Sequence, residues 1–302
     1  MTRYWLASYP KSGNTWLRML IANLLATDGP VDINNLPERG GIASARAPFD
    51  HLTLIDSGLL TLDEIDTLRP RVYEELFAGA DDDEYDTQPD RTKIVFVKAH
   101  DAYTLTPSGE PLLAGARGAA GAIVVVRDPR DVAPSLAHHM GTDMDAAIAF
   151  MGNAEAGFCI RVDRQANQLR QRLPGWSGFM ASWLEQADIP VHLVRYEDMK
   201  VDTVSVLRAV LDFAGRPATE AEIERAVAYA DFRQLKNQEQ EKGFREAPRA
   251  GFFRRGETGS WRQELTPAQV TQIEADHALM MQRLGYPLSG MIPTNHAERE
   301  TG

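Results

Sequence analysis

Four short apolar runs, separated and followed by helix-like patterns, most constrain the fold of this chain. They read RYWLASY (3–9), KIVFVKA (93–99), AIVVVR (122–127) and VHLVRY (191–196), and each is rich in β-branched or aromatic residues. Three of them are almost uninterrupted, which is typical of strands buried on both faces. The sequence therefore predicts an α/β fold with a central parallel sheet of about four to five strands, flanked by helices on both faces.

Several longer stretches have the amphipathic period of α-helices. They include TWLRMLIANLLA (15–26), SGFMASWLEQA (177–187), VSVLRAVLDFA (204–214), EAEIERAVAYA (220–230) and AQVTQIEADHALMMQRL (268–284). Thr266 and Pro267 fit the N-cap and the first position of the last helix. No internal repeat or interdomain linker is visible, so we expect one domain over residues 1–302.

Two regions are expected to be irregular. Residues 32–92 lack a clear period and contain the acidic run DDDEYD (81–86), which is typical of a solvated loop. Residues 236–261 are polar, basic and rich in glycine, and they indicate a mobile loop ahead of the last helix.

Charge and cysteine content limit the classes of function. The net charge of −11 argues against a general nucleic-acid binder, although a local group of Lys and Arg can still bind a small anion. The single cysteine, Cys159, excludes an internal disulfide and a multi-cysteine metal site, which favours a reducing compartment. Arg18 and Asn23 interrupt the first apolar helix, which is too short to cross a bilayer. We therefore expect a cytoplasmic protein without a secretory signal or transmembrane segment.

Polar residues follow the first strand, at the edge where parallel α/β sheets bind ligands. The loop PKSGNTW (10–16) places Lys11 at the start of a helix, where backbone N–H groups and the helix dipole favour an anion. Ser12, Asn14 and Thr15 add hydroxyl and amide donors. The Walker pattern is absent because Lys11 precedes the only glycine of the loop. A plain strand–helix turn fits the composition equally well.

Lys98 and His100 end the second strand. Because side chains alternate along a strand, both project to the same side of it. A neighbouring cation disfavours protonation of a histidine, and a neutral imidazole suits a general base. A structural histidine at a strand end is the alternative.

The third strand is followed by Arg127 and by a helix that we expect to begin near Asp131. Such a start places Pro134 in the first turn, where a missing N–H costs little. Ser135 would then lie early on this helix, within reach of the same crevice as Arg127. The planar guanidinium of an arginine suits a phosphate group.

Three other features remain open on sequence alone. Tyr196–Asp198 follows the fourth strand, and Arg254–Gly256 lies in a loop that could fold over a second phosphate or simply be solvated. His138 and His139 are sequential and lack nearby partners, so we interpret them as helix-surface or pocket-lining residues and predict no metal site.

Taken in order, these motifs resemble those of the sulfotransferases that use 3′-phosphoadenosine 5′-phosphosulfate (PAPS), especially the cytosolic type and its bacterial relatives. YPKSGNTW is similar to the family's 5′-phosphosulfate loop, KAH to its K-[TS]-H, RDPRDVAPS to its 3′-phosphate segment, YEDM to its Y-E-D and RRGETGSW to its R-K-G-x-x-G-D-W. The resemblance runs from Tyr9 to Trp261 and implies a P-loop-like sheet. Ala99 and Ser260 depart from the family pattern.

The resemblance implies a role for each matching residue. Lys11 would assist the leaving phosphate, Lys98 would contact the transferred sulfuryl group, and His100 would be the general base of an in-line displacement. The residues implied to bind PAPS are Lys11, Ser12, Gly13, Asn14, Thr15, Trp16, Arg127, Ser135, Tyr196, Phe232, Arg254, Arg255 and Gly256. Among these, Trp16 and Phe232 would lie at the adenine. The 3′-phosphate would be held by Arg127, Ser135, Arg254, Arg255 and Gly256, with Tyr196 nearby.

The acceptor is expected to be a small molecule with a hydroxyl group. Phe49, Leu52, Leu54 and Phe252 suggest an apolar wall, which fits a phenol, a hydrophobic alcohol or a lipidic natural product. Only Thr266 matches the dimer motif of many cytosolic members, so the oligomeric state stays open.

Two other functions are alternatives. A small-molecule kinase could use the same crevice, but the Walker glycines are missing and ATP has no group for the second arginine cluster. The second alternative is a nucleotide-binding protein without catalytic activity. The presence of Lys11, Lys98 and His100 argues against it.

Overall fold

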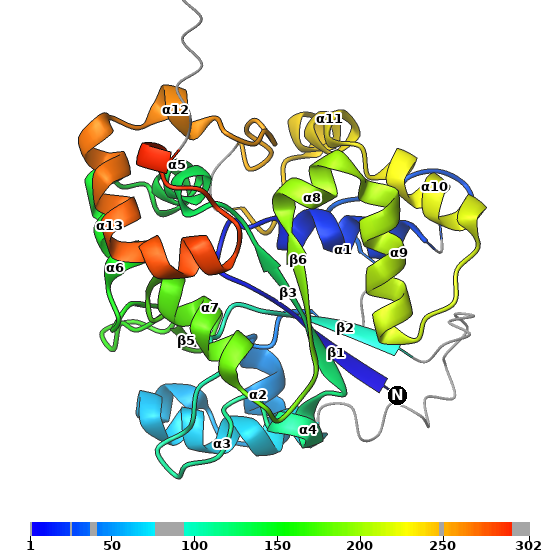
Figure 1. Ribbon diagram of the computed structural model, residues 1–302. Helices are drawn as coiled ribbons and strands as arrows, with labels where there is room; N and C mark the ends of the chain where they lie inside the picture. Colours follow the sequence, from blue (N-terminus) through cyan, green and yellow to red (C-terminus); the bar gives the residue numbers. More distant parts are fainter. Residues whose placement is uncertain (1, 25, 37–40, 76–93, 248–250, 292–302) are drawn as a thin grey trace, which may run out of the picture.

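The predicted parallel α/β sheet is confirmed in a computed structural model, which describes residues 2–24, 26–36, 41–75, 94–247 and 251–291. The four predicted strands form one parallel sheet in the order β2-β1-β3-β6 (Figure 1). They are β1 (Thr2–Ser8), β2 (Ile94–Ala99), β3 (Gly121–Val126) and β6 (Val191–Arg195). A small antiparallel pair, β4 (Gly157–Phe158) and β5 (Gln171–Arg172), was not predicted. The acidic run at 81–86 lies outside the described residues.

Helices fill most of the remaining described chain. They are α1 (Asn14–Asn23), α2 (Arg46–Thr53), α3 (Leu62–Glu75), α4 (Gly115–Gly118), α5 (Pro129–Met140), α6 (Met144–Gly152), α7 (Gly175–Glu185), α8 (Tyr196–Val201), α9 (Thr203–Ala214), α10 (Glu220–Tyr229), α11 (Phe232–Lys242), α12 (Trp261–Glu264) and α13 (Pro267–Arg283), with the short 3₁₀ helices η1 (Ser57–Leu59) and η2 (Ser289–Met291). The five predicted helices correspond to α1, α7, α9, α10 and α13. The start of α13 is confirmed, because Thr266 caps it and forms a capping box with Gln269.

Two predictions of irregular structure are wrong in part. Residues 32–92 contain α3, a helix of 14 residues whose apolar side chains pack into the core. The segment 236–261 begins inside α11, which extends to Lys242. In both cases tertiary packing stabilises helices whose local pattern is weak.

The predicted start of α5 near Asp131 is also wrong. Asp128 caps the helix by accepting a hydrogen bond from the backbone N–H of Arg130 at 2.9 Å, and Pro129 occupies the first position. This Asp-Pro pair is a strong start signal, which moves Pro134 from the expected first turn into the helix interior.

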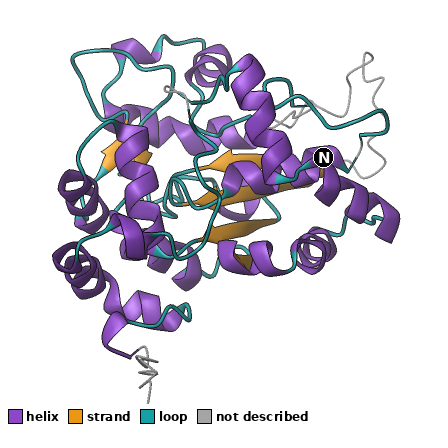
Figure 2. Ribbon diagram, turned by 90° about the horizontal axis from the view of Figure 1, so that it is seen from above, coloured by secondary structure: helices purple, strands orange, loops and turns teal. Residues whose placement is uncertain are grey.

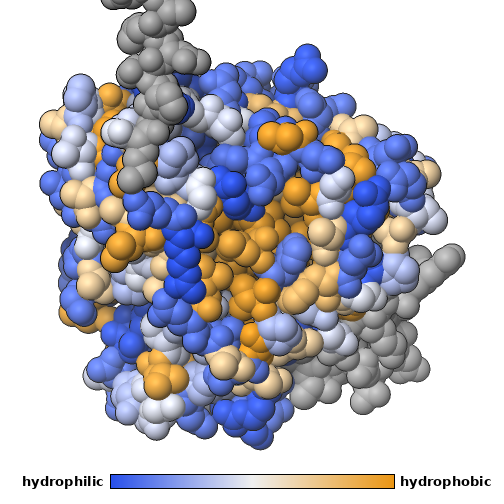
Figure 3. Space-filling view, viewed as in Figure 1, coloured by the Kyte–Doolittle hydropathy of each residue, from blue (hydrophilic) through white to orange (hydrophobic). Residues whose placement is uncertain are grey.

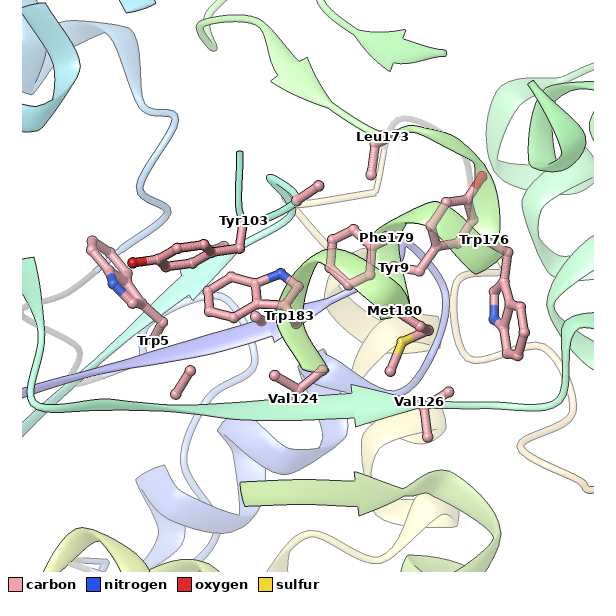
Figure 4. Packing of buried hydrophobic residues seen from close by; sticks show 14 of the residues in the cluster. Trp5, Tyr9, Tyr103, Val124, Val126, Leu173, Trp176, Phe179, Met180 and Trp183 are labelled. Carbon is pink, nitrogen blue, oxygen red and sulfur yellow. The ribbon is translucent and has the colours of Figure 1, made fainter. Parts of the chain in front are cut away.

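Alternating side chains of the strands build two cores, one on each face of the sheet. Trp5 and Ala7 of β1 point into one core, and Leu6 points into the other. The first core contains residues of α3, α5, α6, α7 and α13, and the second contains residues of α1, α9 and α10. Figure 2 shows helices on both sides of the strands, and Figure 4 shows how Trp176, Phe179 and Trp183 of α7 pack in the first core.

The sheet register places three strand ends at one level. Ala7 of β1 pairs with Ala99 of β2, and Ser8 pairs with Val125 of β3. The chain leaves β1 toward β2 on one side, whereas β3 lies on the other side, so the strand order reverses beside β1. Ligands bind at such a reversal, outside the carboxyl ends of the strands.

Strand β6 forms one edge of the sheet, and its Val191 and Leu193 are only half-buried. Hydrophobic residues gather around it in the middle of the face seen in Figure 3. No helix in the described part of the chain is long and apolar enough to span a membrane.

Candidate active site

A cavity of about 610 Å³ opens where the strands end, and it brings together nearly all the predicted site residues. Its lining includes Lys11, Gly13, Asn14, Thr15, Trp16, Lys98, His100, Arg127, Ser135, Tyr196, Phe232, Arg254, Arg255 and Gly256. Ser12 is the exception among the predicted residues, since it is fully buried and does not line the cavity. Its hydroxyl has no hydrogen-bond partner in the described part of the chain.

The loop between β1 and α1 has the geometry of an anion-binding turn. Gly13 adopts a φ of 106°, and a Cβ at this position would lie 2.5 Å from the ring of Tyr196, so only glycine fits. The side chain of Asn14 donates a hydrogen bond to the Leu6 carbonyl at 2.7 Å, which holds the loop on the strand. No side chain of the described residues caps α1, so the backbone N–H groups of Asn14 and Thr15 at its start are available to an anion.

Lys11 lies close to three other positively charged side chains. Burial, together with the charges of Lys98, Arg127 and Arg254, lowers the pKa of Lys11 to about 7. Its ammonium lies 3.5 Å from the centre of the Phe252 ring. An anion bound here would relieve this repulsion, and the residues present therefore fit a phosphate-bearing ligand.

His100 is held as a neutral imidazole. Its Nδ1 lies 2.8 Å from the carbonyl oxygen of Ser8. Because a carbonyl only accepts, Nδ1 carries the ring hydrogen, and Nε2 presents its lone pair. Burial, and secondly the charge of Lys98, lowers the pKa of His100 to about 3.

Glu246 is a site residue that the sequence did not reveal. Its carboxylate lines the cavity, accepts a hydrogen bond from Lys98 at 3.0 Å and pairs with Arg18 of α1 at 2.8 Å. Burial alone would raise the pKa of Glu246, but the charges of Lys98 and Arg18 lower this pKa to about 2. Glu246 therefore stays ionised and fixes the position of Lys98.

Arg127 lies between Tyr196 and the loop before α12. Its guanidinium carbon is 4.5 Å from the centre of the Tyr196 ring, and its Nη2 donates to the Glu257 carbonyl at 2.8 Å. This arrangement presents a planar cation to the cavity.

The loop that carries Arg254, Arg255 and Gly256 is anchored by two carboxylates. Glu264 binds Arg254 and lies 3.6 Å from Arg255. Asp131 of α5 accepts hydrogen bonds from the backbone N–H of Gly259 at 2.6 Å and of Trp261 at 2.9 Å. Ser260, one of the departures from the family pattern, also donates to Asp131, at 3.3 Å. No local sequence signal predicts these anchors.

Trp16 and Phe232 lie at one side of the cavity. The indole N–H of Trp16 donates to the Ala230 carbonyl at 3.0 Å. A Cβ at Gly256, where φ is 63°, would lie 2.3 Å from the Phe232 ring. Gly256 therefore allows the arginine loop to pack directly on this ring.

The predicted apolar wall is wrong for three of its four residues. Phe49 is buried in the core, Leu54 is 89% exposed, and neither they nor Leu52 line the cavity. The reason is that α2 turns Phe49 inward and leaves Leu52 and Leu54 exposed. Phe252 lines the cavity as expected, and other apolar side chains in the lining include Ile42, Met140, Phe158 and Phe253.

The two sequential histidines do not form a metal centre with other side chains of the described residues. No group of three or more His, Cys, Asp or Glu in this part of the chain could hold a metal ion. His139 instead lines the cavity.

Comparison with known proteins places the chain in a family. The model of the sulfotransferase domain matches residues 1–285. Flavonol 3-sulfotransferase of Flaveria bidentis is 26% identical over 284 residues, which cover 89% of this chain and 78% of the relative. Sulfotransferase 1A1 of the dog, Canis lupus familiaris, is 25% identical over 294 residues, which cover 93% and 83%.

Solved structures share the fold. Retinol dehydratase in complex with androsterone and the inactive cofactor PAP (adenosine 3′,5′-bisphosphate) has a TM-score of 0.60 at 18% identity, covering 96% of this chain and 83% of that one. A mouse sulfotransferase complexed with PAP has a TM-score of 0.57 at 19% identity, covering 93% and 84%.

The α/β fold places a cation-lined cavity at the strand ends, and this cavity fits an anionic ligand. The chain belongs to the sulfotransferase family. It is a PAPS-dependent sulfotransferase, as the motifs of its sequence predicted.

Proposed function

We propose that this enzyme transfers the sulfuryl group of PAPS to the hydroxyl group of a small molecule, with His100 as general base. The observation that carries the proposal is that one cavity is lined by Lys11, Arg127, Arg254 and Arg255 and also by Lys98 and His100. The cations come from two strand ends and from the loop before α12, which suits a ligand with two separated phosphate groups.

The 5′ side of the nucleotide is assigned to the loop after β1. PAPS supplies an activated sulfuryl group, bonded through oxygen to its 5′-phosphate. Lys11 and the first N–H groups of α1 stabilise the negative charge that this phosphate gains as the sulfur–oxygen bond breaks. Because this charge is larger in the transition state than before it, Lys11 accelerates the reaction and does more than bind.

His100 removes the proton of the acceptor. Its Nε2 takes the hydroxyl proton while the acceptor oxygen forms its bond to sulfur, and the products are a sulfate ester and PAP. Lys98 stabilises the sulfuryl oxygens during this in-line transfer, and Glu246 holds Lys98 in place.

The rest of the nucleotide is assigned to the cofactor residues predicted from the sequence. Arg127, Ser135, Arg254, Arg255 and the backbone of Gly256 bind the 3′-phosphate, with Tyr196 packed against Arg127. Trp16 and Phe232 contact the adenine, and Ser12, Gly13, Asn14 and Thr15 complete the phosphosulfate loop.

Thermal denaturation tests the choice of nucleotide. PAP at about a hundred times its dissociation constant stabilises the folded state by about 2.7 kcal/mol. We expect a smaller increase in melting temperature with ATP at equal concentration, because ATP has no 3′-phosphate for Arg254 and Arg255. Equal increases would count against the assignment of these arginines.

The low pKa of Lys11 predicts that PAP binding takes up a proton above neutral pH. Its pKa is about 7 in the free protein, and a bound phosphate raises it, so uptake is absent well below pH 7 and appears above it. The affinity for PAP is therefore expected to fall as the pH rises through this range. Calorimetry in two buffers that differ in ionisation enthalpy measures the uptake. Lys11→Arg, which stays charged, should bind without it, whereas equal heats for the unmodified protein would contradict the prediction.

The proposal also covers the acceptor, the cellular location of the enzyme and its domain organisation. A phenol, a hydrophobic alcohol or a lipidic natural product fits the apolar lining, and relatives include flavonol and luciferin sulfotransferases. We assign the enzyme to the cytoplasm, supported by its single cysteine and by relatives named cytosolic sulfotransferases. The family match over residues 1–285 supports one domain, and the net charge of −11 argues against nucleic acid as a partner.

A further inference from the structure

The cavity has a wall that the nucleotide residues do not use. It includes the apolar side chains of Ile42, Met140 and Phe158, and three polar side chains from one segment: Arg164, Asn167 and Gln168. This segment connects β4 to β5. Because the wall lines the same cavity as His100, it is where an acceptor would lie.

The polar segment is fixed to the rest of the protein just beyond Arg164. The side chain of Arg46 donates to the Ala166 carbonyl at 2.6 Å, and its backbone N–H donates to the Asn167 carbonyl at 3.1 Å. The backbone N–H of Leu169 donates to Ser44 at 2.7 Å. The position of the segment in the cavity wall is therefore determined by contacts with α2 and the residues before it.

Arg164 differs in its ion pairing from the other arginines of this segment and of β5. Arg161 pairs with Asp163, and both Arg170 and Arg172 pair with the buried Asp66. No carboxylate in the described part of the chain forms an ion pair with Arg164, although this is the arginine of the four that lines the cavity. Arg164 itself is exposed.

We propose that Arg164 binds an oxyanion of the acceptor, so that the preferred acceptor is an amphipathic hydroxyl compound that also carries a carboxylate or similar group. This inference rests on the proposed function. A guanidinium binds a carboxylate through two parallel hydrogen bonds, and the neighbouring amides of Asn167 and Gln168 add donors. The apolar side chains of Ile42, Met140 and Phe158 contact the body of the acceptor between this anion and the hydroxyl group at His100.

Binding to the PAP-loaded enzyme tests the proposal without requiring turnover. The probes are para-hydroxyphenylacetate and its neutral primary amide, which differ in charge and little in shape. Since partly exposed ion pairs contribute modestly, we expect the acid to bind about fivefold to twentyfold more tightly than the amide. Arg164→Gln should abolish this preference by weakening the acid alone, with the affinity for PAP unchanged.

Arg161→Gln is the matched control, because Arg161 lies three residues away, pairs with Asp163 and does not line the cavity. It should keep the full preference for the acid. Equal affinities of acid and amide in the unmodified protein, no measurable binding of the acid, or a preference that survives in Arg164→Gln would each overturn the proposal. If the preference is present but neither probe is sulfated from PAPS, the proposed transfer to phenols is wrong and the assignment of Arg164 stands.

Discussion

Replacement of His100 with alanine is expected to lower kcat for sulfuryl transfer by about a hundredfold to ten-thousandfold, the usual contribution of a general base. The Nδ1 hydrogen bond to Ser8 fixes the ring so that Nε2 can take the proton. Alanine leaves the acceptor hydroxyl without this base. Because the ring is neutral, its removal changes no charge in the cavity, and the affinity for PAP should hardly change. Steady-state kinetics with a phenol and calorimetry with PAP measure the two quantities.

His51→Ala provides the control, because His51 is exposed on α2 and lies outside the cavity. It should retain the kcat of the unmodified enzyme. A His100→Ala variant with full activity would refute the assignment of the base. An equal loss of PAP affinity would instead indicate that His100 acts mainly by shaping the cavity.

Replacement of Arg69 with methionine is expected to lower the free energy of unfolding by about 3–5 kcal/mol, since removal of one partner leaves a buried charge uncompensated. Arg69 and Asp101 are fully buried, and Nη2 of Arg69 lies 2.7 Å from Oδ2 of Asp101. The same arginine also bonds Asp66, at 3.3 Å. Urea denaturation measures the change. Because Asp101 directly follows His100, we also expect a lower kcat in the folded fraction.

Arg71→Met is the matched control on the same helix. Arg71 is 72% exposed, and among the described residues it pairs with Glu74 and Glu75. Its replacement should change the free energy of unfolding by less than about 0.5 kcal/mol, as is usual for surface ion pairs. A similar loss in both variants would mean that the cost comes from α3 itself and not from the buried charges.

The sequence predicted those parts of the structure that are determined by residues close to one another along the chain. Buried strands show as apolar runs, and the residues after them, such as Lys11, His100 and Arg127, meet because parallel strands end at one edge. The start of α5 could also have been predicted from the sequence, because Asp128 and Pro129 fit the N-cap and the first position of a helix. Our prediction placed this start near Asp131 instead.

Contacts between distant segments were beyond sequence reasoning. Glu246 approaches Lys98 across 148 residues, and Asp131 binds the backbone of Trp261 across 130. A charged residue in a polar loop gives no sign of its partner, because the partner is chosen by tertiary packing. The prediction of the acceptor wall was wrong for the same reason. The burial of Phe49 depends on which face of α2 packs against the core, and neither the period nor the composition of the segment reveals that face.

Turnover with PAPS tests the account most directly. The enzyme is incubated with PAPS and a panel of phenols and alcohols, and both products are measured by high-resolution mass spectrometry. We expect PAP and a sulfate ester in equal amounts, with no product when ATP replaces PAPS. Release of PAP without a sulfated acceptor across the panel, or a phosphorylated product formed from ATP, would contradict the account.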